Sequence, residues 1–386
     1  MLLKNGLVLN RKFEFINADV LIQDKKIAAV REGICSENDE VIELNGKLVL
    51  PGFINIHVHG AVGYDMMNPG EGGLAAVSRF MALHGATSFM PTTVTLPLDD
   101  TLTAMSYLAE HSDADYNGAN ILGIHSEGIY MSEVYRGAHV AQWLKPPSEV
   151  NFEILNEAAG GKIKLVTVAP ELDGALEMIR RITPDVRVSL GHGGQDYRVC
   201  KRAFEAGASQ ITHMFNAMPP LHHRNPTLIA AAFEADAFVE LICDGIHVNP
   251  VMVKMAYSMF GADRIVVITD GMPATGLGAG KYFFAGEEVI VSGGTALKRD
   301  GTINGSTSTM MQCVINLVNW GIPVESAVKM AARNPAHAVS VQDRKGCIDV
   351  GFDADLLVTD ADLNIENVIV MGKGIINNYE NSGKQL

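Results

Sequence analysis

Two histidines, His57 and His59, lie in the stretch PGFINIHVHG at residues 51–60. The apolar run 53–58 is typical of a short buried strand, and it follows a Pro-Gly turn. Residues two apart in a strand project to the same side, so both imidazoles can reach one divalent cation. The alternative is a pair of strand histidines that only hydrogen-bond to the backbone. The pair alone does not choose between these interpretations.

Other groups with metal-binding or acid–base chemistry follow apolar runs further along the chain. They are Glu127, His192, His213, His247 and Asp270. Histidine nitrogen and carboxylate oxygen without a thiolate suit Zn²⁺, Fe²⁺, Mn²⁺ or Co²⁺, and we expect zinc first among these. One or two divalent ions per chain would use His57, His59, Glu127, His192 and His213.

Strand-like runs that precede these groups alternate with helical stretches such as 72–85 and 199–208. The runs are residues 53–58, 87–93, 121–126, 164–169, 186–191, 210–214, 239–243 and 265–270. Eight strand–helix units predict an α/β fold, a (β/α)8 TIM barrel, whose active-site groups come at the carboxyl ends of the strands. A doubly wound open sheet is the alternative. The GLGAGK stretch (276–281) matches no phosphate-binding motif, and we expect a loop there.

The two ends of the chain are rich in short alternating strands separated by turns. Neither end is long enough to build a good core alone. We therefore expect residues 1–50 together with 346–386 to form one small β-sandwich domain. Residues 51–345 would then be the metal-dependent barrel domain.

Composition limits the classes of partner. A formal charge of −14 over 386 residues argues against nucleic acid or an anionic membrane. The N-terminal segment lacks the apolar core of a signal peptide, and no apolar run is long enough to span a membrane. Five scattered cysteines without a CxxC pair are typical of reduced thiols. A cytoplasmic enzyme with a small-molecule substrate is the expectation.

Several motifs together resemble those of the N-acetylglucosamine-6-phosphate deacetylases, which belong to the amidohydrolase superfamily. Besides PGFINIHVHG, they are HSEG (125–128), GAH (137–139), APE (169–171), GH (191–192), THMFNAMPP (212–220), CDGIHV (243–248), ITDGM (268–272) and INGS (303–306). The resemblance covers nearly the whole chain. It implies a barrel with a split β-domain, and hydrolysis of the acetamide of N-acetylglucosamine-6-phosphate to glucosamine-6-phosphate and acetate.

The resemblance also implies roles for the metal-site groups. Glu127 matches the family's metal-bridging glutamate, with His192 and His213 completing the shared site. The HxH pair varies in that family, so its presence here suggests a second metal on His57, His59 and Glu127. Asp270 would be the catalytic acid–base that moves the water proton to the departing amine. His247 would polarise the acetyl carbonyl.

Substrate contacts are implied by the same motifs. Arg224 stands eleven residues after His213, as does the family's phosphate-binding arginine. The other implied contacts are Ala138, His139, Asn216, Ala217 and the loop Ile303, Asn304, Gly305, Ser306. The family is dimeric and shares its phosphate site between subunits, so a homodimer is expected.

One departure from the family pattern concerns the substrate. Members usually have proline after HxEG, whereas this chain has Ile129 in HSEGIY. A related sugar phosphate such as N-acetylgalactosamine-6-phosphate is therefore an alternative substrate. So is a cyclic amide or dipeptide. A non-catalytic sugar-phosphate sensor is a further alternative, and the complete set of metal-site groups argues against it.

Overall fold

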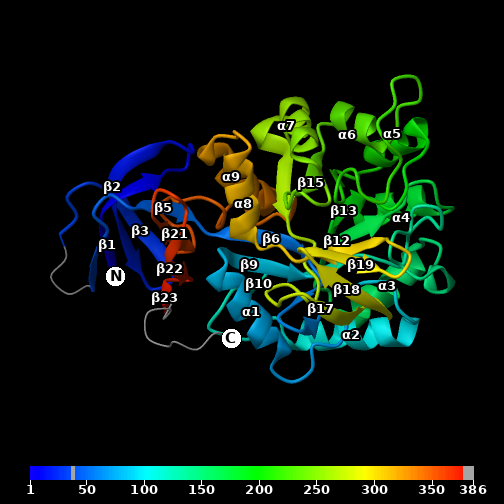
Figure 1. Ribbon diagram of the computed structural model, residues 1–386, viewed down its shortest axis with the longest axis horizontal. Helices are drawn as coiled ribbons and strands as arrows, with labels where there is room; N and C mark the ends of the chain where they lie inside the picture. The colour runs from blue at the N-terminus through cyan, green and yellow to red at the C-terminus, as the bar shows by residue number, and fades with distance from the viewer. Residues whose placement is uncertain (36–39, 377–386) are drawn as a thin grey trace.

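The computed structural model describes residues 1–35 and 40–376 of an α/β protein (Figure 1). Parts of the terminal segments discussed above, residues 36–39 and 377–386, lie outside the described residues. In Figure 1 the first and last strands, blue and red, lie together at one end of the molecule. The helices and strands of the middle of the chain make up the other end. Among the helices of the described residues, none is long and apolar enough to cross a membrane.

Parallel strands form the centre of the larger part. In one six-stranded sheet, neighbouring strands are also consecutive in the sequence. These strands are β11 (Ile124–Ser126), β12 (Ile163–Val168), β13 (Arg187–Leu190), β14 (Gln210–Ile211), β15 (Phe238–Ile242) and β16 (Ile265–Ile268). A second sheet has the order β10 (Asn120–Ile121), β9 (Ala86–Pro91), β6 (Phe53–Val58). Every residue of β6, β9 and β16 is buried, as expected for parallel strands covered on both faces.

All eight expected strand runs contain a strand, but the run 121–126 is broken. Its two parts, β10 and β11, are separated by Leu122 and Gly123. Gly123 has a φ of +150°, and a Cβ atom there would lie 2.4 Å from the Lys164 side chain. Glycine allows this conformation and the close approach to β12, and the chain changes its pairing here from β9 to β12, so the two strands enter different sheets.

Helices surround the strands. They are α1 (Gly73–Leu83), α2 (Leu98–His111), α3 (Glu149–Ala158), α4 (Ala175–Ile182), α5 (Tyr197–Glu205), α6 (Leu228–Glu234), α7 (Pro250–Arg264), α8 (Met310–Asn319), α9 (Val324–Ala331) and α10 (Arg333–Ala338), with a 3₁₀ turn at Ala141–Trp143. Their apolar residues recur every three to four positions, so each helix buries one face. In α4, for example, Ala175, Met178, Ile179 and Ile182 are buried. The side chain of Asp196 caps α5 by accepting from two backbone N–H groups.

Strands from both chain ends share one eight-stranded sheet. Its order is β23-β22-β21-β5-β1-β2-β3, and β4 pairs with β1. The strands are β1 (Leu2–Leu9), β2 (Phe15–Gln23), β3 (Lys26–Arg31), β4 (Val41–Glu43), β5 (Leu48–Pro51), β21 (Leu356–Thr359), β22 (Ile365–Val370) and β23 (Lys373–Ile376). The antiparallel pair β5–β21 joins the two ends of the chain. Asp353, next to this seam, forms ion pairs with Lys26, Arg344 and the buried Lys345.

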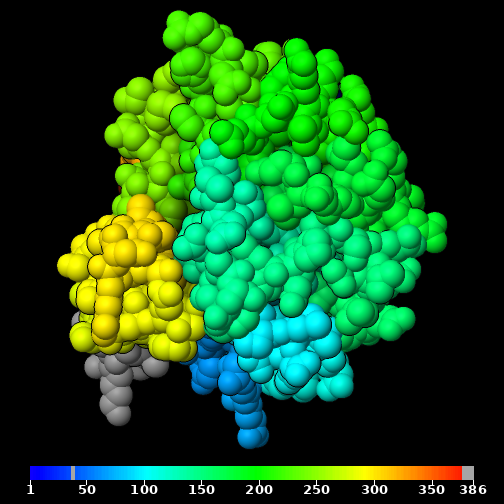
Figure 2. Space-filling model, turned by 90° about the vertical axis from the view of Figure 1, so that its right-hand side faces the viewer, coloured from blue at the N-terminus to red at the C-terminus, as the bar shows by residue number. Residues whose placement is uncertain are grey.

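An antiparallel sheet near the carboxyl end of β16 was not predicted. It contains β17 (Gly280–Phe284), β18 (Glu287–Ser292), β19 (Thr295–Lys298) and β20 (Ile303–Ser306), joined by short turns. The expectation of a loop at 303–306 was therefore wrong, because β20 pairs with β19. The predicted loop at 276–281 also ends early, since Gly280 and Lys281 begin β17. Figure 2 shows this sheet, in yellow, beside the cyan and green part of the chain. A two-stranded ribbon of β7 (Gly60–Ala61) and β8 (Tyr64–Asp65) follows β6.

Candidate active site

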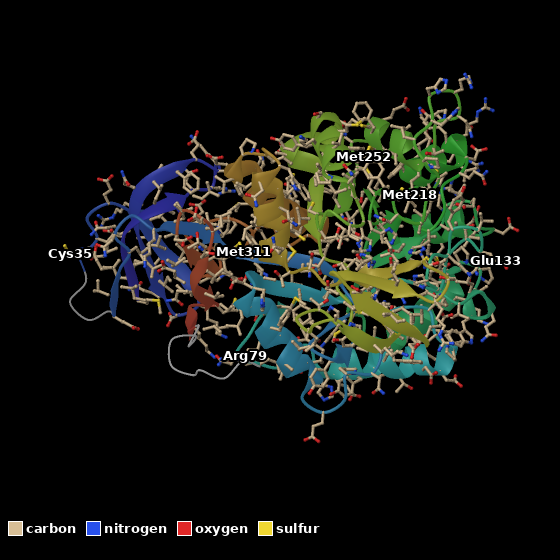
Figure 3. All side chains as sticks on the ribbon, viewed as in Figure 1. Cys35, Arg79, Glu133, Met218, Met252 and Met311 are labelled. Carbon is tan, nitrogen blue, oxygen red and sulfur yellow. The ribbon has the colours of Figure 1, made fainter. Side chains whose placement is uncertain are left out.

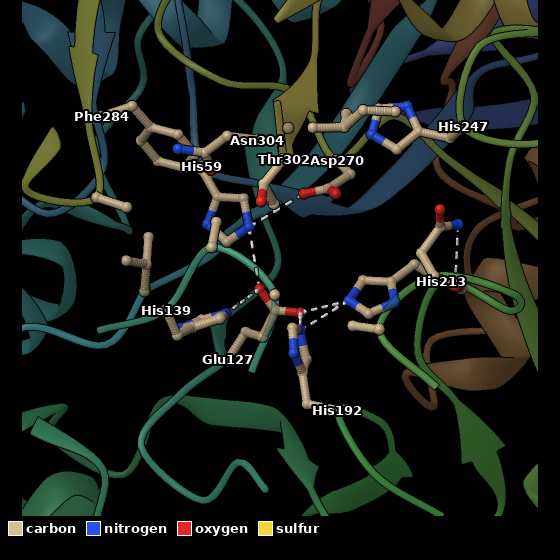
Figure 4. Close-up of a pocket in the computed structure, with 18 residues that line it drawn as sticks. His59, Glu127, His139, His192, His213, His247, Asp270, Phe284, Thr302 and Asn304 are labelled. Carbon is tan, nitrogen blue, oxygen red and sulfur yellow. Dashed lines mark hydrogen bonds and ion pairs between the residues drawn. The ribbon is translucent and has the colours of Figure 1, made fainter. Parts of the chain in front are cut away.

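A cavity opens at the carboxyl ends of the parallel strands (Figure 4). The predicted site residues that line it are His59, Glu127, Ala138, His139, His192, His213, Asn216, Ala217, His247, Asp270, Ile303, Asn304 and Gly305. Ile303, Asn304 and Gly305 lie in β20 of the antiparallel sheet, and the others follow different parallel strands. Because parallel strands end at one edge, the fold brings these residues together. His57 lies directly beneath this group and is fully buried.

Glu127, which follows β11, is the centre of the site. Its Oε1 lies 3.0 Å from Nε2 of His213 and 3.3 Å from Nε2 of His192. Its Oε2 lies 3.1 Å from Nε2 of His59 and 3.3 Å from Nε2 of His57. One buried carboxylate therefore contacts both histidine pairs (Figure 4 draws three of these contacts). This is the arrangement that a bridging metal ligand requires.

The hydrogen-bond partners of the Nδ1 atoms determine the tautomers of the histidines. His59 Nδ1 lies 3.1 Å from the carbonyl oxygen of Thr92, and His192 Nδ1 lies 3.0 Å from that of Tyr135. A carbonyl oxygen only accepts, so each Nδ1 carries a hydrogen and donates. In the neutral ring, Nε2 is then a bare lone pair that points at Glu127.

The second member of each pair adds another lone pair to the same place. Nε2 of His57 lies 3.2 Å from Nε2 of His59, and Nε2 of His213 lies 3.0 Å from Nε2 of His192. Lone pairs on nitrogen and carboxylate oxygen repel at such distances unless a proton or a metal ion lies between them. The donor set therefore fits divalent metal ions that favour nitrogen and oxygen ligands.

The electrostatics of the cluster also favour a cation. Burial opposes protonation of His57 and His59, but the carboxylates around them outweigh it. The pKa of His57 is raised well above its ordinary 6.5, and the pKa of His59 is raised to about 9. Burial opposes ionisation of Glu127 and Asp270, but the surrounding histidines lower both pKa values. Both carboxylates are therefore ionised at neutral pH, and the positive charge that balances them can come from protons on the histidines or from a metal ion.

His139 lies close to the cluster, but its tautomer differs. Its Nδ1 accepts the backbone N–H of Thr95 at 3.2 Å, so the hydrogen of the neutral ring is on Nε2. Burial lowers the pKa of His139 to about 3, which keeps the ring neutral. Its Nε2 lies 3.8 Å from Oε2 of Glu127. An N–H at this position is a hydrogen-bond donor at the edge of the cavity.

Asp270 and His247 line the cavity from two later strands. Asp270 follows β16, and its backbone N–H donates to the carbonyl of His57 at 3.0 Å. His247 follows β15, and its Nδ1 lies 2.7 Å from Oδ2 of Asp244. A carboxylate oxygen accepts, so Nδ1 carries a hydrogen and this bond fixes the orientation of the ring.

Four of the site residues other than glycine have left-handed backbone conformations. The φ angles are 47° for His192, 29° for His213, 49° for Ala217 and 51° for Asp270. Residues other than glycine adopt this region at a cost, and such strain concentrates at functional sites. The surrounding hydrogen bonds thus maintain side-chain directions that the backbone alone disfavours.

Two predicted substrate contacts do not line the cavity. Arg224 is exposed, and its backbone N–H donates to Nδ1 of His222. Ser306 is buried in β20, where its hydroxyl donates to the carbonyl of Thr269 and its N–H to that of Asp270. Ser306 therefore contacts the backbone that carries Asp270.

Sequence reasoning missed other residues around the site. Phe284 and Ala285 enter the cavity lining from the unpredicted sheet. Thr95 sets the tautomer of His139, and no sequence pattern indicates that contact. Glu240 lies in β15, and its side chain receives a hydrogen bond from His57. The sequence feature that could have indicated Glu240 is the presence of an acidic residue inside the apolar run VELIC (239–243).

Comparison with known proteins identifies the family. A sequence model of the amidohydrolase family matches residues 48–375. The chain is 36% identical over 380 residues to N-acetylglucosamine-6-phosphate deacetylase from Bacillus subtilis, with 96% of each chain covered. This chain belongs to the N-acetylglucosamine-6-phosphate deacetylase family of amidohydrolases.

Solved structures of the family have the same fold. A variant of the Mycobacterium smegmatis deacetylase in complex with N-acetyl-D-glucosamine-6-phosphate has a TM-score of 0.91 and 31% identity, covering 97% of this chain and 99% of that one. The Thermotoga maritima deacetylase has a TM-score of 0.87 and 30% identity, with 97% and 99% covered. A related N-acetylgalactosamine-6-phosphate deacetylase from Escherichia coli O157:H7 is 33% identical, covering 86% of this chain and 89% of its own length.

Proposed function

We propose that this family member is a metal-dependent deacetylase that hydrolyses the acetamide of N-acetylglucosamine-6-phosphate to glucosamine-6-phosphate and acetate. The observation that carries the proposal is the convergence of two histidine pairs on Glu127 in a cavity that Asp270 also lines. The family relatives with this named activity support it over most of the chain.

Divalent metal ions fit the donor set described above. Glu127, His192 and His213 would hold one ion, and His57, His59 and Glu127 a second. We expect zinc, with iron, manganese or cobalt as alternatives. When bound, a divalent ion lowers the pKa of water from 15.7 to about 7 and so makes hydroxide available at neutral pH.

The residues of the chain supply the remaining chemistry. Asp270 accepts the proton of the attacking water and returns it to the amine as the tetrahedral intermediate collapses. His247 donates a hydrogen bond to the acetyl carbonyl, where negative charge develops during attack. The Nε2–H of His139 donates to a sugar oxygen.

The remaining substrate contacts carry over from the family motifs. Asn216, Ala217 and Ala138 line one side of the cavity, and residues 303–305 line another. We assign phosphate binding to Arg224, whose guanidinium can hold phosphate through two hydrogen bonds. Because Arg224 is exposed, this assignment requires the phosphate to lie toward the cavity mouth.

The architecture proposed with this function is a closed (β/α)8 TIM barrel at residues 51–345. Single parallel bridges, Thr92 to His125 and Val58 to Gly271, connect the two parallel sheets and support closure. Residues 1–50 and 346–386 would form a β-sandwich domain, and the sheet shared by both chain ends supports it.

We also propose a cytoplasmic homodimer. All five cysteines are free and four are buried, which agrees with a reducing compartment, while the exposed Cys35 lies at the edge of the terminal sheet (Figure 3). The dimer rests on the family resemblance. Light scattering at micromolar concentration should give twice the chain mass, and a fully active monomer would contradict a phosphate site shared between subunits.

A second substrate, N-acetylgalactosamine-6-phosphate, is favoured by Ile129 in place of the family's usual proline and by the relative that carries this name. Acetate release from both epimers, from an N-acetylated sugar without phosphate, and from dipeptide and cyclic-amide substrates tests the proposal. The glucosamine derivative should give the highest kcat/KM. A higher value for the galactosamine epimer would reassign the substrate, and hydrolysis of only the peptide or cyclic amide would contradict the deacetylase function.

A further inference from the structure

Glu240 is a buried carboxylate to which neither the motifs nor the proposed mechanism give a role. It lies in the middle of β15 between Val239 and Leu241, and all three residues are fully buried. Among the described residues, no lysine or arginine forms an ion pair with it, and its one charged contact is His57. A buried carboxylate is costly to keep unless hydrogen bonds satisfy it, so its hydrogen bonds indicate what it does.

Each carboxylate oxygen of Glu240 has a partner. Oε2 accepts from Nδ1 of His57 at 3.0 Å and from the backbone N–H of His213 at 3.2 Å. Oε1 accepts from Nε2 of Gln210 at 2.6 Å. One side chain therefore contacts a histidine of each candidate metal group, in one case through the ring and in the other through the backbone.

The bond to His57 fixes the chemistry of that ring. Because N–H groups of Gln210 and His213 donate to its two oxygens, the Glu240 side chain acts as an acceptor, and Nδ1 of His57 carries the hydrogen of their bond. Nε2 is then free to bind a cation on the side of His59 and Glu127. A carboxylate behind a ligating histidine also makes the ring a stronger base, and its removal typically weakens metal binding about 10- to 100-fold.

We propose that Glu240 is a positioning residue that fixes the tautomer and direction of His57 and so raises the affinity of the His57–His59 group for a divalent cation. The inference rests on the proposed metal-dependent function and adds one residue to it. The effect on the other group is smaller, because Glu240 contacts only the backbone of His213, which any acceptor at this position can bind.

Zinc binding tests the proposal without reference to activity. Metal-free protein is loaded with Zn²⁺ and titrated with a competing chelator, for the wild type and for Glu240→Gln. The glutamine keeps the shape and removes the charge. Zinc at the His57–His59 group should bind about 10- to 100-fold less tightly in Glu240→Gln than in the wild type. Zinc at the His192–His213 group should change less. Equal zinc affinities in the two proteins would overturn the proposal.

A matched control and a double-variant cycle separate positioning from a general loss of structure. Gln210→Leu removes a hydrogen bond on the other side of the same carboxylate and leaves the His57 contact. Its zinc affinity should stay close to that of the wild type even if its melting temperature falls as far as that of Glu240→Gln. In a His57→Asn background, Glu240→Gln should have no further effect on zinc affinity. An undiminished effect there would show that Glu240 does not act through His57.

A measurement on the wild-type protein covers the case in which Glu240→Gln does not fold. Nitrogen NMR of the metal-free protein should find a hydrogen on Nδ1 of His57, and a bare Nδ1 would overturn the proposal. Failure of the proposed function is a separate result. It would appear as the absence of acetate release by the zinc-loaded wild type, whatever the comparison with Glu240→Gln gives.

Discussion

Oδ1 of Asp270 lies 3.1 Å from Nε2 of His59 and 3.5 Å from Nε2 of His57. The proposed proton carrier is thus adjacent to the His57–His59 group, which would hold a metal ion. Its ionised form is favoured there, since its pKa is lowered by the charge of His57 and the hydrogen bond from His59 despite burial. A carboxylate that is ionised at neutral pH can accept a proton at the start of each turnover.

Replacement of Asp270 by asparagine keeps the shape of the side chain and removes the base. General acid–base catalysis is typically worth about 10² to 10⁴ in rate, so kcat should fall by that factor while KM changes little. Steady-state kinetics and the metal content of the same sample check this. Turnover of Asp270→Asn near the wild-type rate, with metal bound, would rule out the proposed proton transfer.

The two histidine pairs should differ in importance. His57→Asn combined with His59→Asn removes two nitrogen ligands of one group, so the metal count per chain should fall by about one. His213→Asn should remove the other ion and nearly all activity. Elemental analysis after dialysis checks both. If the metal count is unchanged in the His57/His59 variant, that pair is structural.

Arg224→Ala should act on binding rather than on the chemical step. Hydrogen bonds to charged groups are worth about 1.5–3 kcal/mol, so KM should rise roughly 10- to 100-fold with a smaller change in kcat. Arg180→Ala, at an exposed position on α4, is the matched control and should leave KM as it is. An unchanged KM in Arg224→Ala would remove the phosphate assignment and leave the deacetylase chemistry in place.

The ion pairs of Asp353 should make the terminal sheet sensitive to acid. Burial raises the pKa of Asp353, but the hydrogen bond from Lys26 and the charges of Lys345 and Arg344 outweigh it, so the pKa lies below its ordinary 3.8. A carboxylate with a lowered pKa in the folded state contributes stability above the unfolded-state pKa. That contribution is lost as the pH falls through the folded-state value.

Asp353→Asn should therefore destabilise the protein at pH 7 by about 3 kcal/mol, because it leaves buried Lys345 with one partner fewer. The difference from the wild type should shrink below about pH 4. Thermal unfolding at several pH values measures both effects. Asp349→Asn, which removes only the exposed pair with Arg11, should change little. Equal stability of Asp353→Asn and the wild type at pH 7 would contradict this account.

The sequence predicted the buried parallel strands well, because a short run of β-branched apolar residues such as 265–268 is typical of a strand buried on both faces. It did not predict β17 to β20, whose residues alternate between buried and exposed over short lengths and pair through local turns. The metal-site candidates could be found because each ends a strand. The tautomer of His139 could not, since it depends on the Thr95 backbone 44 residues away. Nor could the role of Glu240, because one acidic residue in an apolar run does not reveal its partner.

The pairing of β5 with β21 also has a consequence for the time course of synthesis. Leu48 to Pro51 leave the ribosome early, whereas their partners Leu356 to Thr359 follow only after all the residues that line the cavity. Until then the nascent chain has a strand edge of mostly apolar residues with open backbone hydrogen bonds, which is a template for unwanted pairing. Translation that stops before Leu356 leaves that edge exposed. The terminal sheet can therefore be completed only after residues 356–359 have been synthesised.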